Sequence, residues 1–413
     1  MVIHRVIDEF LNTRWYLQQV TGRIKDLEQN HNLADWQCFR LLEGSKTLLE
    51  QSQLPERARK PACLAVILND MLTGLWRDPQ VLDTRKKQEL YDLCKLLCTK
   101  NEGGHAKALP MDETSHHVWH ADLLQSQLSS LEAPIRKVLE EGVVRTAGMI
   151  LRQLDRAKVR TISDYNLHCH ALNGVLQITL AQIFTACGTE SSYLGNGEHL
   201  SNALGLVNAK THEIVNFRTH AKLGMASWPR DIWGLYSIDD VGDFLRPGKE
   251  RAFEYCLNTM IFDALQHVPD VYFFLSRIED PAVFRLFALE QMINITTLCR
   301  MYGGGSLGML PTVQMGEGET MSLHRQLMGL SDFQRMLQDE LRGVRDKLGP
   351  SDPISDPMAL FLGRMETLCC RTRNKSFVLT PWELTWGTVI ELCLVAVIGL
   401  ILAVASSHLY KIL

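Results

Sequence analysis

The chain has 413 residues, of which 46% are hydrophobic and 22% are charged, so it can fold around a sizeable core. This composition excludes intrinsically disordered and fibrous proteins. The 43 basic residues are balanced by 47 acidic ones, and the net charge of −4 gives no basic excess that would favour nucleic acid as a partner.

Apolar residues recur at helical spacing along most of the chain, and the alternation typical of strands is nearly absent. In chain order, helices are expected at residues 34–51, 62–75, 121–154, 167–185, 203–218, 252–265, 271–278, 283–300 and 332–346. Loops are expected where Gly and polar residues gather, at residues 101–112, 188–198, 303–318 and 348–358. The pattern predicts an all-α protein.

The C-terminal segment differs from everything before it. Residues 392–410 read LCLVAVIGLILAVASSHLY and contain no Asp, Glu, Lys or Arg. A helix of this length spans about 28 Å, close to the hydrocarbon thickness of a bilayer. Trp382 and Trp386 lie just before it, where an aromatic belt is expected. We therefore predict a single-pass C-terminal transmembrane helix; the alternative is a buried core helix.

These features divide the chain into four parts. We expect an N-terminal extension (1–34), a helical domain (35–346), a linker rich in Pro, Ser and Asp (347–378) and the transmembrane anchor (379–413). Basic residues are more frequent before the membrane helix than after it, which places the helical domain on the cytosolic or matrix side.

Three ordered blocks resemble the squalene synthase family. Residues 164–177, DYNLHCHALNGVLQ, resemble its segment DYxLYCHYVAGLVG. Residues 205–236 resemble its second signature, GLFLQKTNIIRDYLED followed by WPxEVWxxY. Residues 267–291 resemble HxPDxxxYLSRLxxxxVFxFCAIPQ. The resemblance covers residues 35–340 and the C-terminal anchor, and it implies an isoprenoid synthase-type helical bundle around a central cavity.

The first of the family's two Asp-rich motifs is degraded. In squalene synthases the acids of both motifs hold Mg²⁺ ions, which hold the diphosphates of two farnesyl diphosphates. The first motif, DTLEDD, falls on residues 73–78. Thr73, Trp76 and Arg77 replace three of its acids. Asp78 remains, but the positive charge of Arg77 beside it opposes a metal ion.

The second motif, DYLED, has lost all its acids. It falls on residues 216–220, where Asn216, Thr219 and His220 take their places. Asn216 and His220 are four residues apart and so share one helix face. Mg²⁺ is a hard cation that prefers carboxylate oxygens, and these side chains do not supply them. We expect no metal here.

Other positions that face the substrates in the family have also changed. Ser45 and Lys46 fall on the family's TSRSF segment, and the two tyrosines of its YCHY segment become His168 and Ala171. Lys210 is retained, but it performs no chemistry by itself.

These losses predict a catalytically inactive squalene synthase-like protein that serves as a structural or accessory subunit of a membrane protein complex. Residues 314–318, QMGEG, replace a basic stretch near the family's NADPH site, so no cofactor is expected. The mitochondrial inner membrane, with its respiratory complexes, is favoured over the endoplasmic reticulum. The alternatives are a divergent active farnesyl-diphosphate farnesyltransferase (squalene synthase) and an isoprenoid- or lipid-binding protein. Collapse of the cavity around Trp76 and Phe217 is favoured over retention of a lipid.

Overall fold

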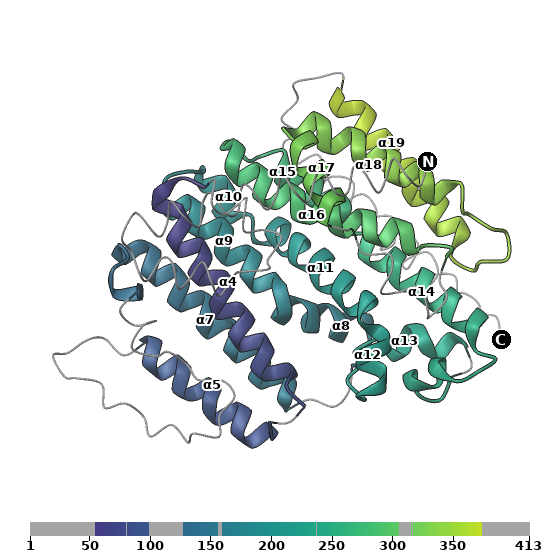
Figure 1. The fold of residues 1–413 in the computed structure, drawn as a ribbon, viewed down its shortest axis with the longest axis horizontal. Helices are drawn as coiled ribbons and strands as arrows, with labels where there is room; N and C mark the ends of the chain where they lie inside the picture. Colours follow the sequence, from purple (N-terminus) through teal and green to yellow (C-terminus); the bar gives the residue numbers. More distant parts are fainter. Residues whose placement is uncertain are drawn as a thin grey trace, which may run out of the picture. The chain divides into compact units, whose positions relative to one another are not determined.

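The computed structural model describes residues 54–79, 81–98, 127–155, 159–236, 238–304, 315 and 317–373. Every regular element within these ranges is a helix (Figure 1), so the all-α prediction is confirmed. The chain divides into two compact units, Met1–Met365 and Glu366–Leu413, and the described part of the second is the end of helix α19. The expected N-terminal extension and transmembrane anchor lie outside the described residues.

The elements follow one another with short connections. They are α4 (Glu56–Arg77), α5 (Asp83–Cys98), α7 (Ala133–Leu154), α8 (Ile162–Cys169), the π-helix η1 (His170–Gly174), α9 (Val175–Ala186), α10 (Ser192–Asn196), α11 (Glu198–Val215), α12 (Phe217–Lys222), α13 (Arg230–Trp233), the 3₁₀ turns η2 (Gly234–Tyr236) and η3 (Val241–Leu245), α14 (Glu250–Leu265), α15 (Val268–Leu275), α16 (Pro281–Met301), α17 (Glu317–Gln326), α18 (Leu330–Arg345) and α19 (Ser355–Arg373).

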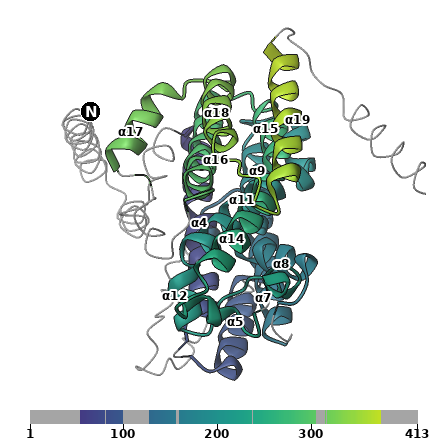
Figure 2. The ribbon, with the colours of Figure 1, turned by 90° about the vertical axis from the view of Figure 1, so that its right-hand side faces the viewer.

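Helix α11 lies at the centre of the first unit. It packs against η1, α9, α14, α15 and α16, while α4 packs against α7 and α9 (Figure 1). Every residue from 203 to 211 is buried, as expected of a helix that is covered on all sides. Helix α18 packs on α16 (Figure 2) through a buried stripe that includes Phe333, Leu337 and Leu341.

Two glycines allow α11 to approach η1 very closely. A Cβ atom at Gly205 would lie 2.4 Å from the Cα atom of Gly174, so any larger residue at 205 would force the backbones apart. The sequence predicted one continuous helix over residues 167–185, but the structure places η1 between α8 and α9. π-Helical turns often occur at functional sites, and this one contributes Leu172 and Asn173 to the cavity described below.

Several boundaries differ from the sequence-based expectation. The helix expected to begin at residue 121 appears as α7 from Ala133, because Pro134 favours the first turn of a helix. Helix α5 was not predicted, since its charged residues dilute the apolar spacing. The segment 347–378, expected as a linker, contains α19. The loop expected at 188–198 contains the short helix α10.

Among the described residues, α16 is long and apolar enough to cross a membrane. In this structure 72% of its most apolar stretch is buried by the rest of the protein, as expected of a core helix. The membrane helix predicted from the sequence is a different segment, residues 392–410, and lies outside the described residues.

Candidate functional site

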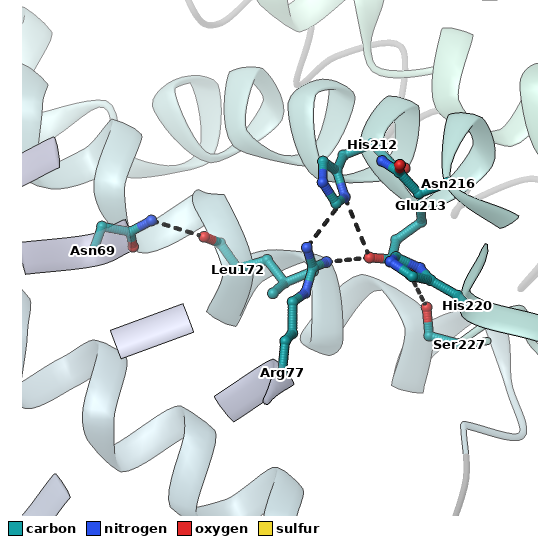
Figure 3. A network of polar contacts seen from close by, with 8 residues as sticks. All are labelled: Asn69, Arg77, Leu172, His212, Glu213, Asn216, His220 and Ser227. Atoms are coloured by element: carbon teal, nitrogen blue, oxygen red, sulfur yellow. Dashed lines mark hydrogen bonds and ion pairs between the residues drawn. The ribbon is translucent and has the colours of Figure 1, made fainter. Parts of the chain in front are cut away.

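The two degraded motifs meet where α4 and α11 end (Figure 3). Arg77, the last residue of α4, forms an ion pair with Glu213 in the last turn of α11. Its Nη1 atom also lies 3.1 Å from Nδ1 of His212, which accepts this hydrogen bond because a guanidinium only donates. A side chain of the first motif region thus binds two side chains that precede the second motif.

Glu213 is the centre of this network. Its side chain is only 2% exposed, and its second oxygen accepts a hydrogen bond of 2.5 Å from Ser227 Oγ and lies 3.3 Å from Nδ1 of His220. Burial by itself raises the pKa of Glu213, but the contacts with His212 and His220 and the charge of Arg77 outweigh burial and hold that pKa well below its usual value. Glu213 is therefore ionised at neutral pH.

The three residues that replace the acids of the second motif have different structural roles. Asn216 caps the end of α11, and its Nδ2 atom donates a 2.9 Å hydrogen bond to the carbonyl oxygen of His212. Thr219 is exposed. Only His220 joins the network around Glu213.

The first-motif residues are similarly dispersed. The hydroxyl of Thr73 donates to the carbonyl oxygen of Asn69 at 2.9 Å, and Asp78 ends α4 as its C-cap. Trp76 packs against His168, with ring centroids 4.8 Å apart. Burial lowers the pKa of His168 to about 4, so this imidazole is neutral at physiological pH.

Lys210 and Ala171 are core residues in this structure. Ala171 is fully buried. Lys210 is fully buried as well, with its Nζ atom 2.6 Å from Asp263 Oδ2 and 2.9 Å from His267 Nε2. Burial, and then the charge of Lys210, lower the pKa of His267 to about 3. Lys210 joins α11 to α14 and does not line the cavity. Ser45 and Lys46 lie outside the described residues.

A metal ion would have to compete with Arg77. Ligand atoms of His212, Glu213 and His220 lie within 4.8 Å of one another, a spacing that can hold an ion. The guanidinium of Arg77, however, already contacts both His212 and Glu213. One carboxylate that is paired with an arginine does not fit the oxygen-rich octahedral shell of Mg²⁺.

A cavity of about 500 Å³ adjoins this network. Its walls come from four elements, α4, η1, α11 and α16. The lining residues are Asn69, Asp70, Thr73, Gly74, Arg77, Leu172, Asn173, Asn208, Ala209, His212, Leu289, Glu290, Ile293 and Asn294. Neither Trp76 nor Phe217, around which collapse was expected, lines this cavity. Phe217 is instead buried against Trp228, with ring centroids 4.0 Å apart.

Sequence reasoning missed the acids that this chain has in place of the lost ones. Glu213 stands where the family segment GLFLQKTNIIRDYLED has Ile, and Glu290 stands where VFxFCAIPQ has Pro. Both acids are visible in the aligned blocks, because each stands at a position where the family has an uncharged residue. Asp70 lies one turn before Thr73 on α4, outside the motif itself.

Comparisons with known proteins agree with the resemblance. The family model for squalene/phytoene synthase matches residues 145–315, which include η1, α11 and most of the cavity wall. Squalene synthase BSS of Botryococcus braunii is 26% identical over 310 residues, which cover 73% of this chain and 66% of that protein. The squalene synthase of Rattus norvegicus is 26% identical over 209 residues, 51% of this chain and 50% of that protein. The chain thus spans between half and two thirds of the length of these relatives.

The structural comparison supports the same fold. The complex of TcSQS with ligand E5700 covers 80% of this chain and 97% of its own, with a TM-score of 0.71 and 23% identity. The described helices therefore share the architecture of that protein. The family model, the curated relatives and the helical bundle agree, and together they make the chain similar to the squalene/phytoene synthase family in sequence and in fold.

Proposed function

We propose that this chain is a non-catalytic member of its family that serves as an accessory subunit of a membrane protein complex. The observation that carries the first half is the ion pair between Arg77 and Glu213. It joins the ends of the two motif helices through a fixed positive charge, at the place where the family's motifs would hold Mg²⁺.

The charges at this site support the proposal that the protein does not ionise an allylic diphosphate. A bound metal ion stabilises a leaving diphosphate by several kcal/mol. A single arginine can bind a phosphate oxygen, but Arg77 is already paired with a buried carboxylate. Releasing Arg77 toward a ligand would leave the Glu213 charge buried with weaker compensation, so the network resists this use.

The membrane-complex half of the proposal rests on the sequence. A bilayer-length apolar segment follows the helical domain, and within it Gly399 and Ala403 are four residues apart, on one face of a helix. Small residues at this spacing allow close packing between membrane helices. A family fold without the family's metal ligands is consistent with a scaffold role, and the mitochondrial inner membrane is our favoured location.

Two experiments test the proposal. Full-length protein in mild detergent is incubated with farnesyl diphosphate, NADPH and Mg²⁺, with the rat squalene synthase as the positive control. We expect neither presqualene diphosphate nor squalene; magnesium-dependent product above a no-protein blank would establish the active-synthase alternative.

In parallel, the full chain and a variant that ends before Leu379 are purified from their native membrane. We expect stoichiometric partners with the full chain only, and a full-length monomer would refute the subunit role.

The isoprenoid-binding alternative is less well supported by the cavity. Its lining includes four Asn residues, two acids and one Arg, and this polar surface does not suit two long isoprenoid chains. Extraction of the purified protein with organic solvent followed by mass spectrometry should therefore find no stoichiometric prenyl lipid.

A further inference from the structure

Asn69 is a cavity-lining residue whose amide has a fixed orientation. Asn69 is 6% exposed, and its Nδ2 atom donates to the carbonyl oxygen of Leu172 at 3.1 Å. This bond fixes the amide, because a flipped Asn69 would place two acceptors against each other. The Oδ1 atom of Asn69 is buried and has no hydrogen-bond partner in the described protein, although the residue lines the cavity. Because less than 1 Å² of this oxygen is accessible, it adds a negative partial charge beside the cavity but is not open to a ligand.

Two carboxyl groups add to the acceptors, and they come from different walls. Asp70 is on α4 and Glu290 is on α16. Asp70 is an exposed residue that lines the cavity, and partial desolvation by the neighbouring protein raises its pKa to about 6. Burial also raises the pKa of Glu290, and the charge of Asp70 raises it further. The two groups therefore interact, and each is harder to ionise than a free carboxyl group.

Neutral amides hold Glu290 in place. Gln177 Nε2 donates to Glu290 Oε2 at 3.1 Å and to Asn173 Oδ1 at 3.0 Å. Asn208 Nδ2 donates to the same Asn173 oxygen, while Asn294 Nδ2 donates to Asn208 Oδ1 at 2.7 Å. These hydrogen-bonded amides position the Glu290 carboxylate but bring no positive charge to it. Among the described residues, the hydrogen bonds to Glu290 come from neutral amides, so its carboxylate is positioned to receive a cation.

The remaining lining indicates what kind of cation fits. Leu289 and Ile293 flank Glu290 on α16, and Leu172 and Ala209 face the cavity from η1 and α11. A volume of about 500 Å³ is in the range of sites for small organic molecules and far exceeds a single ion. The occupant that matches acids, amide acceptors and aliphatic walls is an alkyl chain bearing an ammonium group.

We propose that the cavity binds an aliphatic amine, with its ammonium group between Asp70 and Glu290 and its alkyl part against Leu289 and Ile293. The amine donates charge-assisted hydrogen bonds to the two carboxylates. This inference goes beyond the accessory role and does not depend on it. The amine can come from a free polyamine or from an amine-bearing lipid, since both present the same group.

The test uses the full-length protein in digitonin, followed by isothermal titration calorimetry and thermal unfolding. Putrescine and spermidine probe the soluble source and dodecylamine the lipid source; 1,4-butanediol has the skeleton of putrescine without its charge. We expect saturable binding of at least one amine and none of butanediol. Saturation by a soluble amine or by dodecylamine identifies the source. Absence of binding by every amine, or equal binding of butanediol, overturns the proposal.

Three variants localise the site. Asp70→Asn and Glu290→Gln should each raise the amine Kd by about ten- to a hundredfold, as the loss of a hydrogen bond to a charged group predicts. Glu141→Gln, an exposed acid on α7, is the matched control and should leave the Kd unchanged. Unfolding midpoints and circular dichroism of each variant show whether it is folded. An unchanged amine Kd in both cavity variants refutes the proposed site. If Mg²⁺ or Ca²⁺ binds instead of the amine, and the two cavity variants weaken that binding, the proposal that the ligand is an amine is refuted.

Discussion

Arg77→Gln removes the positive charge that joins α4 to α11. Glu213 is 2% exposed and Arg77 26% exposed in their side chains. Removing one partner of a fully buried ion pair costs about 3–5 kcal/mol, because a charge is left uncompensated. Partial exposure of Arg77 and the remaining contacts of Glu213 with His220 and Ser227 reduce this, so we expect a loss of about 2–3 kcal/mol.

The assay is denaturant unfolding of the full-length protein in mild detergent, followed by far-UV circular dichroism. In thermal unfolding followed by the same signal, a loss of this size should lower the midpoint by about 3–5 °C, because the unfolding entropy of about 300 residues is roughly 0.6 kcal/mol/K. Glu213→Gln and the double variant complete a mutant cycle, in which we expect a coupling energy of at least about 1 kcal/mol. Because the pKa of Glu213 is lowered in the folded state, its charge stabilises the fold above the ordinary carboxyl pKa and ceases to do so as pH falls through the folded value. The destabilisation by Arg77→Gln should therefore be full at neutral pH and shrink in strong acid.

Arg57→Gln is the matched control for this prediction. Arg57 also lies on α4 and bridges to another element through Glu132, but both side chains are more than half exposed. Exposed pairs are screened by water and contribute little, so this variant should shift the midpoint much less. A change of less than about 0.5 kcal/mol for Arg77→Gln, or no coupling with Glu213, would refute the proposed link between the motif helices.

Three further predictions use the same unfolding assay. Asp70→Asn should raise stability at pH 8, because burial raises the pKa of Asp70 to about 6 and disfavours its ionised form in the fold. This gain in stability should fade as pH falls below 6, and a gain that persists unchanged in acid would contradict the raised pKa of Asp70. Gly205→Ala, whose Cβ would lie 2.4 Å from the backbone of η1, should cost about 1–3 kcal/mol, whereas Gly343→Ala meets no atom and should stabilise α18 by about 0.5–1 kcal/mol; equal effects would argue against the close approach. Lys210→Met should cost about 3–5 kcal/mol by leaving Asp263 without its ammonium partner, and adding Asp263→Leu should restore much of that loss if the pair is structural.

Local physics made the fold readable from the sequence. Apolar residues at helical spacing predicted α14, α16 and α18 within two residues at each end, because each helix must bury one face or more. The three family blocks then supplied the arrangement of these helices. Where the prediction failed, as at α5, charged residues masked the spacing, and tertiary packing stabilises the helix regardless of that weak local signal.

The chemistry of the site could be predicted only in part from the sequence. The sequence by itself determined which metal-binding acids are lost, since this depends on residue types at motif positions. It did not determine that Arg77 would find Glu213, 136 residues away, or that Asp70 and Glu290 would share one cavity. Those pairs exist because α4, α11 and α16 line the same cavity, and a side chain's partners and pKa depend on which charges the packing of helices brings within a few ångströms.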